Sequence, residues 1–170
     1  MKTLFGATRT VFEQDKYKIL KASSRDAPVV SALTKGDWSE RVAISQRRKN
    51  DNPTQIADDL RAGGGLVLYR NNLPVAALSY VKARDGSWEL RRLGVTRTFS
   101  GRGFTTLLLD TLERLAKQSE IRSIRIPVES YSPQYKAYFE KLGFSVESDR
   151  TFSTVFAGAL QPIRMRKVVA

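Results

Sequence analysis

The spacing of hydrophobic and polar residues predicts a strand and then a helix near the start of the chain. Residues 17–23, YKILKAS, alternate in the manner of a strand. Residues 24–33 then show helical spacing. Ser24 or Asp26 is a suitable cap for this helix, because either side chain can accept a hydrogen bond from a free amide of the first turn.

A second helix and an antiparallel meander follow. The stretch PTQIADDLRAGGG predicts a helix with Thr54 as its cap and the glycines 63–65 as its end. Turn residues at Asn71–Asn72 and Asp85–Gly86 then divide a hydrophobic region into three strands. These strands cover residues 66–70, 74–83 and 88–95.

The rest of the chain alternates helices and strands. Leucines at helical spacing predict an amphipathic helix over 102–118, followed by a buried strand over 122–130 and a short helix that ends at Gly143. Residues 151–170 predict a closing hairpin. A strand that follows a crossover helix usually runs parallel to the strand before it, so 122–130 is expected beside 88–95. This order predicts an α/β domain with a mixed sheet covered by helices.

Composition limits the chemistry that the chain can perform. The length of 170 residues suits one domain over residues 1–170, with residues 1–15 as an N-terminal arm. Because there is no cysteine and no histidine, a thiolate zinc site is excluded and a general base must be a carboxylate, a lysine, a tyrosine or a relayed water. The carboxylates form no cluster that predicts a metal site. No apolar run is long enough to span a membrane and no signal-peptide core is present, which predicts a cytoplasmic protein.

The formal net charge of +12 is the strongest compositional signal. A field of this size attracts polyanions such as nucleic acid or an acidic protein surface. A generic solvated basic surface is the alternative interpretation.

The glycine loop SGRGFT, residues 100–105, joins the third meander strand to the leucine-rich helix. A helix that starts there exposes unpaired N–H groups, which bind anions together with the positive end of the helix dipole. Gly101 and Gly103 permit a close approach, and Arg97 and Arg102 add positive charge. The setting lacks the Gly-Lys-Ser/Thr of a P-loop and the order of a dinucleotide fold. A flexible turn before a helix is the simpler alternative.

Three segments together resemble the GNAT (Gcn5-related N-acetyltransferase) family. LGVTRTFSGRGFTTLLLDTLERLA is similar to the acyl-CoA motif of that family, in which a strand ending in Val precedes Q/R-x-x-G-x-G/A and a leucine-rich helix. SPQYKAYFEKLGFSVES is similar to the segment N-x-x-A-x-x-x-Y-E-K-x-G-F, and PIRMRKVVA resembles the usual final strand.

The resemblance implies an α/β GNAT fold, whose mixed, mostly antiparallel sheet is split between its fourth and fifth strands and carries helices on both faces. Acetyl-CoA, or another acyl-CoA, would enter that split and pair its pantetheine with backbone near Leu93 and Val95. The implied ligands of its diphosphate are the backbone amides of Ser100, Gly101, Arg102, Gly103, Phe104 and Thr105.

The chain departs from the family at four motif positions. These positions hold Ser100, Thr105, Ser132 and Phe139. Ser132 and Phe139 fall where the family places a coenzyme-facing Asn and a Tyr that protonates the departing thiolate, and phenylalanine cannot protonate anything. Tyr135, one turn earlier, and the adjacent Tyr138 are the candidate donors, with simple packing and protonation by solvent as alternatives.

Glu89 in WELRRLGV falls six residues before the motif valine, where the histone-acetyltransferase branch of the family places its catalytic glutamate. Strand alternation would put Glu89 and Arg91 on one face and Arg92 on the other. Since central strands rarely bury unpaired charges, Glu89 and at least one arginine are expected to face the substrate cleft. A purely structural Glu–Arg pair is the alternative, and nearby arginines would weaken the glutamate as a base by favouring its ionised form.

Three further residues are candidate acceptor contacts, together with Arg91 and Arg92. Arg47 and Arg48 lie in the region that forms a wall of the acceptor groove in the family, and Glu129 lies near the end of the second strand of the split. The alternative for the two arginines is a solvated helix face. The alternatives for Glu129 are a structural pair with Arg125 or simple solvation at the surface.

The leading hypothesis is an acyl-CoA-dependent N-acyltransferase that acetylates an amine on a polyanionic or nucleic-acid-linked acceptor: an aminoacyl-tRNA, a nucleobase or an associated protein. The alternative is a catalytically altered GNAT-fold protein that binds nucleic acid, or a DNA-base modifier similar to the phage Mom proteins, which ELRRLGV resembles. The expected partners are acyl-CoA, tRNA or DNA or an acidic protein, and a second copy in a homodimer, with no membrane.

Overall fold

The computed structural model describes residues 9–35, 52–128, 133–147 and 163–169. In these residues eight strands form one sheet in the order β1-β2-β3-β4-β5-β6-β8-β7. The strands are β1 (Thr10–Gln14), β2 (Tyr17–Ala22), β3 (Gly63–Arg70), β4 (Leu73–Lys82), β5 (Trp88–Val95), β6 (Ser123–Val128), β7 (Ser145–Val146) and β8 (Ile163–Val168). The helices are η1 (Ser24–Asp26), α1 (Ala27–Thr34), α3 (Pro53–Ala62), η3 (Arg97–Phe99), α4 (Phe104–Gln118) and α5 (Pro133–Lys141).

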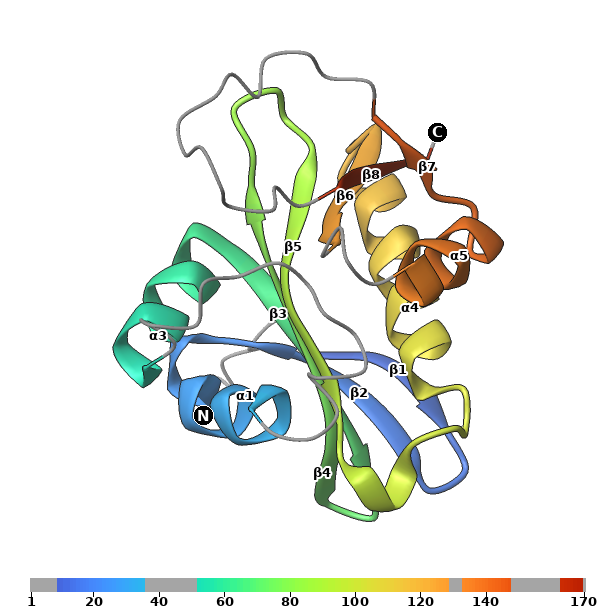
Figure 1. Ribbon diagram of the computed structural model, residues 1–170. Helices are drawn as coiled ribbons and strands as arrows, with labels where there is room; N and C mark the ends of the chain where they lie inside the picture. The colour runs from blue at the N-terminus through green and yellow to red at the C-terminus, as the bar shows by residue number, and fades with distance from the viewer. Residues whose placement is uncertain (1–8, 36–51, 129–132, 148–162, 170) are drawn as a thin grey trace.

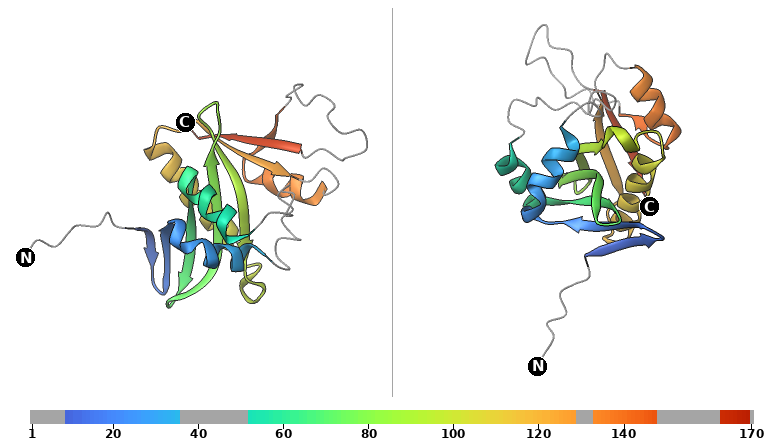
Figure 2. Two further views of the ribbon diagram at one scale, coloured as in Figure 1. Left: turned by 90° about the vertical axis from the view of Figure 1, so that its left-hand side faces the viewer. Right: turned by 90° about the horizontal axis from the view of Figure 1, so that it is seen from below.

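Helices cover both faces of this sheet (Figures 1 and 2). On one face α1 and α3 pack against β3, β4 and β5, where Val30, Ile56 and Val67 belong to a small buried cluster. On the opposite face α4 packs against the same strands and β6, and its Leu108 and Leu112 belong to the main core. No helix among the described residues is long and apolar enough to cross a membrane.

The β5–β6 pair is the parallel pair that the crossover helix predicts. All other strand pairs in the described residues are antiparallel. The sheet has one more strand at its N-terminal edge than the sequence pattern predicts. The strands predicted as the fourth and fifth are therefore β5 and β6. The α/β fold class with a mixed, mostly antiparallel sheet is therefore confirmed.

That additional strand is β1, which lies within the predicted N-terminal arm. It pairs with β2 around a turn in which Asp15 has a positive φ of 52°. Its short run of alternating residues is a weak local signal, and pairing with β2 is what makes it a strand.

Two predicted helix boundaries move by one or two residues. The cap of α3 is Asn52 in place of Thr54, since the Asn52 side-chain oxygen accepts a hydrogen bond from the Gln55 amide at 2.8 Å. Helix α4 begins at Phe104 in place of Arg102, because Gly103 has a left-handed φ of 80° that no helical residue adopts. Of the predicted closing hairpin, residues 163–169 are described and contain β8, while 151–162 lie outside the described residues.

The glycines 63–65 do more than end α3, because they also begin β3. A Cβ on Gly63 would lie 2.1 Å from the carbonyl oxygen of Tyr80, and one on Gly65 would lie 2.8 Å from that of Leu78. The run of glycines therefore lets β3 approach β4 more closely than side chains would allow.

Candidate active site

Strands β5 and β6 pair over only two positions. Trp88 is opposite Ile124 and Glu89 is opposite Arg125. From Leu90 to Val95, β5 remains paired with β4 on its other side but with no described residue of β6. Within the described residues, one edge of β5 is thus unpaired over the six residues that lead to the glycine loop, and its outward N–H and C=O groups suit pairing with an extended ligand.

A β-bulge lies where the two strands part. Leu90 is opposite Tyr80 and Arg92 is opposite Ser79, so Arg91 is an extra residue on β5. A bulge bends and twists the strand that contains it. The position of the bulge accounts for the separation of β5 from β6 directly after Glu89.

The bulge also corrects the predicted alternation of side chains. Glu89 is opposite Val81 and Arg92 is opposite Ser79 on the same face of β4, so Glu89 and Arg92 share the face that α1 and α3 cover. The prediction of opposite faces was wrong, because it counted every residue of β5 as part of a regular pleat.

The glycine loop has the geometry of an anion cradle. Gly101 and Gly103 have positive φ angles of 76° and 80°, and a Cβ built on either would meet nothing within 4 Å. The first backbone bond into α4 runs from the Leu107 amide to the Gly103 carbonyl at 3.0 Å. The amides of the first turn of α4 therefore have no carbonyl partner within the helix and point at the space beside the loop.

Side chains next to this loop supply positive charge. The Arg102 and Arg70 guanidiniums lie 5.1 and 5.7 Å from the centre of the Phe99 ring. Such stacking fixes the orientation of a guanidinium without occupying its N–H groups. Sequence reasoning missed Arg70 and Phe99, because Arg70 comes from β3 and no local pattern connects it with the loop.

The residues that differ from the family pattern in this loop are engaged in local structure. The Ser100 hydroxyl donates to the Arg97 carbonyl at 2.9 Å, and Thr105 is buried. Phe104 is also buried and packs against Tyr17 in a tilted arrangement, with ring centres 5.2 Å apart. The Ser100 amide also donates to the Arg97 carbonyl, at 3.2 Å, so the predicted use of this amide for the diphosphate is not retained. What Phe104 and Thr105 leave for a phosphate is their backbone, which does not depend on side-chain identity.

Glu89 and Arg91 lie beside the bulge and are paired with each other. The Arg91 Nη2 lies 3.4 Å from Glu89 Oε1, and the Glu89 side chain retains 16% exposure against 39% for Arg91. Arg92 is different, since its side chain is 4% exposed and its Nη1 lies 2.7 Å from Asp59 Oδ2 in α3. Arg92 thus connects the sheet to α3, and we do not include it among the substrate contacts.

The two tyrosines of α5 are more exposed to solvent than Phe139. Tyr135 and Tyr138 are half-buried and pack against the main core. Phe139 has no exposed surface and makes edge contacts with Tyr138 and Phe144, with ring centres 5.2 and 5.9 Å apart. Phe139 is therefore a core residue in this chain, and we do not retain it as a coenzyme contact.

Several predicted site residues lie outside the described residues. They are Arg47, Arg48, Glu129 and Ser132. Leu93 and Val95 are described, with buried side chains on the open part of β5, which leaves their backbone as the part available to a ligand.

Two features of the site match the chemistry of acetyl-CoA. The open edge of β5 matches the amide-bearing pantetheine arm, and the glycine loop with its free amides and stacked guanidiniums matches the diphosphate. These two features are continuous along the chain, since the loop follows β5 directly.

Known proteins support this assignment. The model of the acetyltransferase (GNAT) family matches residues 30–144, which is more than half of the chain. A comparison with curated proteins found no match.

Solved structures share the fold at low identity. PaiA N-acetyltransferase from Thermoplasma acidophilum, in complex with coenzyme A, has a TM-score of 0.70 and 16% identity, with 91% of this chain and 99% of that chain covered. The ribosomal-protein-S18-alanine N-acetyltransferase from Escherichia coli has a TM-score of 0.68 and 15% identity, covering 91% and 94%. IAA acetyltransferase from Bacillus cereus has a TM-score of 0.64 and 18% identity, covering 89% and 99%. With the family model matched over most of the fold and a site that fits the coenzyme, this chain belongs to the GNAT acetyltransferase family, as an N-acetyltransferase that uses acetyl-CoA.

Proposed function

We propose that this acetyltransferase modifies an amine carried by nucleic acid or by a protein bound to it, such as an aminoacyl-tRNA or a nucleobase. The observation that carries the proposal is the net charge of +12, with 29 basic and 17 acidic residues. Such an excess raises the local concentration of a polyanionic acceptor and speeds its encounter with the site.

In the proposed site, the amides of residues 101–105 hold the diphosphate and the open backbone of Leu93 and Val95 pairs with pantetheine. Bound acetyl-CoA supplies the activated acetyl thioester. The stacked Arg70 and Arg102 neutralise phosphate charge at the loop, since two oriented guanidiniums bind phosphate oxygens more strongly than neutral donors do.

Glu89 is the proposed base. An aliphatic acceptor amine is protonated at neutral pH and must lose a proton before it attacks, whereas a nucleobase amine loses its proton as the new bond forms. Glu89 is a carboxylate that lies where β5 separates from β6. Arg91, 3.4 Å away, orients the carboxylate. A water held by Glu89 could relay the proton to it.

Proton delivery to the departing thiolate is assigned to Tyr135 or Tyr138, with solvent as the competing source. Both tyrosines retain exposed surface, unlike Phe139. A catalytically altered protein that only binds nucleic acid, or a base modifier similar to the Mom proteins, is the alternative function. The complete burial of Phe139, which occupies the family's tyrosine position, favours this alternative function.

Two measurements test the proposal. Acetyl-CoA and free CoA should each raise the thermal midpoint, because a ligand that binds only the folded state stabilises it. The protein should then transfer labelled acetyl groups from acetyl-CoA to total tRNA, to DNA or to a nucleic-acid-bound protein, located by mass spectrometry of digested fractions.

The outcomes separate the alternatives. Stabilisation by acetyl-CoA with label in none of these fractions, but in small polyamines, would exclude the proposed acceptor class and leave the acetyltransferase assignment intact. Binding of nucleic acid without any transfer would favour the altered, non-catalytic protein.

A further inference from the structure

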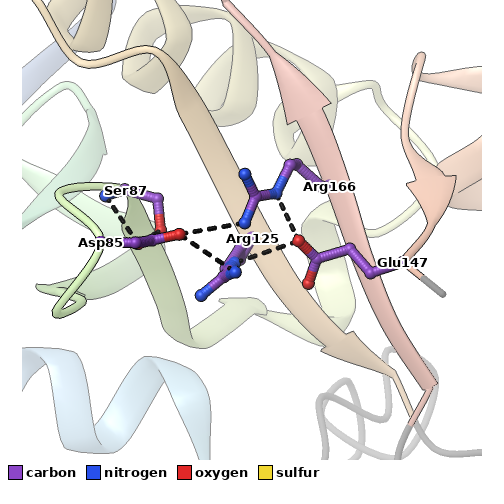
Figure 3. A network of polar contacts seen from close by, with 5 residues as sticks. All are labelled: Asp85, Ser87, Arg125, Glu147 and Arg166. Atoms are coloured by element: carbon purple, nitrogen blue, oxygen red, sulfur yellow. Dashed lines mark hydrogen bonds and ion pairs between the residues drawn. The ribbon is translucent and has the colours of Figure 1, made fainter. Parts of the chain in front are cut away.

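A group of charged side chains lies at the end of β5 that is remote from the glycine loop (Figure 3). It unites the β4–β5 turn with β6, β8 and the end of β7, and its members are Asp85, Arg125, Glu147 and Arg166. Arg125 Nη2 forms an ion pair with Asp85 Oδ2 at 3.0 Å, and Arg125 Nε donates to Glu147 Oε1 at 3.2 Å. Arg166 donates to the same two oxygens, from Nη2 to Asp85 at 3.0 Å and from Nε to Glu147.

These contacts orient the arginine pair, Arg125 and Arg166, and among the described residues they leave part of each guanidinium unused. Each arginine uses Nε and Nη2, and neither Nη1 has a hydrogen bond within the part of the chain that the structure describes. A guanidinium has five N–H donors in a rigid plane, so two acids that fix its plane also aim the remaining donors.

Asp85 is itself held in its ionised form. The Ser87 hydroxyl donates to Asp85 Oδ1 at 2.6 Å and the Ser87 amide donates to it at 3.0 Å. The Ser87 hydroxyl is the largest cause that lowers the pKa of Asp85 to about 2, with further lowering by Arg125 and Arg166 against an opposing effect of burial. The anchor of the arginine pair therefore stays charged at physiological pH.

The arginine pair lies in a cross-strand row with Glu89. Glu89 is opposite Arg125, and Arg125 is opposite Arg166, so all three side chains leave the same face of the sheet. Neighbouring side chains in such a row are about 5 Å apart, which puts Arg166 about 10 Å from the proposed base. Arg84, exposed on the β4–β5 turn next to Asp85, adds a further positive charge at this end.

This end of the sheet is distinct from the coenzyme loop. Glu89 and Val95 are six residues apart on β5, which corresponds to about 20 Å. A phosphate bound by the arginine pair would thus lie on the far side of Glu89 from the diphosphate of the coenzyme.

We propose that the arginine pair, with Arg84, binds the phosphodiester backbone of the nucleic-acid acceptor and so places its amine at Glu89. The proposal rests on the nucleic-acid-linked acceptor proposed above and adds where on this molecule that acceptor docks. Charge complementarity favours this occupant, because oriented guanidinium donors beside a surplus of exposed cations match closely spaced phosphates.

The test measures binding of fluorescein-labelled tRNA, and of a duplex DNA with the same number of phosphates, by anisotropy over a range of NaCl concentrations. Arg84→Ala and Arg166→Gln should each lower the slope of log affinity against log salt by about 1, as expected for one lost phosphate contact. Arg25→Ala is the matched control, since Arg25 is also exposed and also precedes an aspartate that pairs with another arginine. It should leave the slope unchanged.

Each outcome has a defined meaning. Unchanged slopes in both variants, with wild-type protein binding tRNA or DNA, would overturn the docking surface while the acceptor class stands. Wild-type protein that binds neither polymer would overturn both. Acetyl-CoA affinity should be unchanged in Arg84→Ala and Arg166→Gln, and a loss there would place their effect on the donor site instead. If Arg166→Gln does not fold by circular dichroism, Arg84→Ala decides, because its side chain is exposed.

Discussion

The extra residue Arg91 decides which side chains of β5 act together. Without it, regular alternation would put Glu89 and Arg92 on opposite faces of the sheet. With it, Glu89 lies at the closed end of the split and keeps partial exposure, while Arg92 is buried against Asp59. One inserted residue thus places a candidate base and a structural ion pair on the same face of the sheet.

Replacing Glu89 tests its role. Glu89→Gln keeps the size of the side chain and removes its ability to accept a proton, so turnover of the identified acceptor should fall roughly 100- to 10,000-fold. The thermal shift given by acetyl-CoA should remain. Glu140→Gln, an exposed acid of α5 that pairs with Lys136, is the control and should retain activity. Full activity in Glu89→Gln at every pH would exclude Glu89 as the base.

Asp85 gives a pH-dependent contribution to stability. Its pKa is lowered from 3.8 to about 2 in the folded protein, so it stabilises the fold above its unfolded pKa and ceases to do so as the pH falls towards 2. Because its side chain is 39% exposed, screening limits this to roughly 1 kcal/mol.

Asp85→Asn should accordingly be about 1 kcal/mol less stable than wild type in urea at pH 7, and the difference should vanish as the pH falls from about 4 to 2. Asp110→Asn, which removes an exposed charge from α4, is the comparison. A difference for Asp85→Asn that persists unchanged to the lowest pH would contradict the assigned cause.

The helix α1 and the strand β5 are fitted to each other at Gly94. A Cβ at this position would lie 2.2 Å from the Leu33 carbonyl oxygen and 2.8 Å from the Thr34 Cα, so the end of α1 packs directly on the β5 backbone. The open edge of β5 that we assign to pantetheine thus has a rigid support on the α1 face.

Gly94→Ala should force α1 away from β5. Overpacking of this kind typically costs about 1–3 kcal/mol, and the displaced β5 should also bind acetyl-CoA more weakly. Gly86→Ala is a useful comparison, because its Cβ meets nothing within 4 Å and only the positive φ of 84° is unfavourable. That variant should lose about 1 kcal/mol and bind acetyl-CoA normally. Unfolding in urea and calorimetric titration measure the two quantities, and equal coenzyme affinity in both variants would refute the link between α1 and the site.

The whole molecule carries more positive charge than its acids can neutralise. Twelve positive charges in excess repel one another in the compact state, and that repulsion is relieved on unfolding. The described ion pairs are mostly on the surface, where each contributes little.

Moderate salt should therefore stabilise the protein. Raising NaCl screens the repulsion among surplus cations, so the thermal midpoint should rise as ionic strength increases to a few tenths molar. Choline chloride at equal ionic strength controls for the identity of the cation. A midpoint that falls with both salts would mean that attractive pairs outweigh the net repulsion.

The sequence by itself determined the elements whose signals are local. The leucine spacing of α4, the Asn71–Asn72 turn and the limits of β5 all follow from neighbouring residues, and both turn asparagines adopt the positive φ that such a hairpin requires. The glycine loop was predictable for the same reason, since its conformation depends on Gly101 and Gly103 themselves.

Only the tertiary structure decided what depends on residues far apart in the chain. The bulge at Arg91 is a property of the β4–β5 register, and the burial of Arg92 depends on Asp59 in α3. The charged group that contains the arginine pair is assembled from four separate segments. The complete burial of Phe139 also depends on the tertiary structure, because it is set by the residues against which α5 packs. Periodicity reports which residues prefer to be buried, whereas packing selects the partners that each charged or aromatic side chain receives.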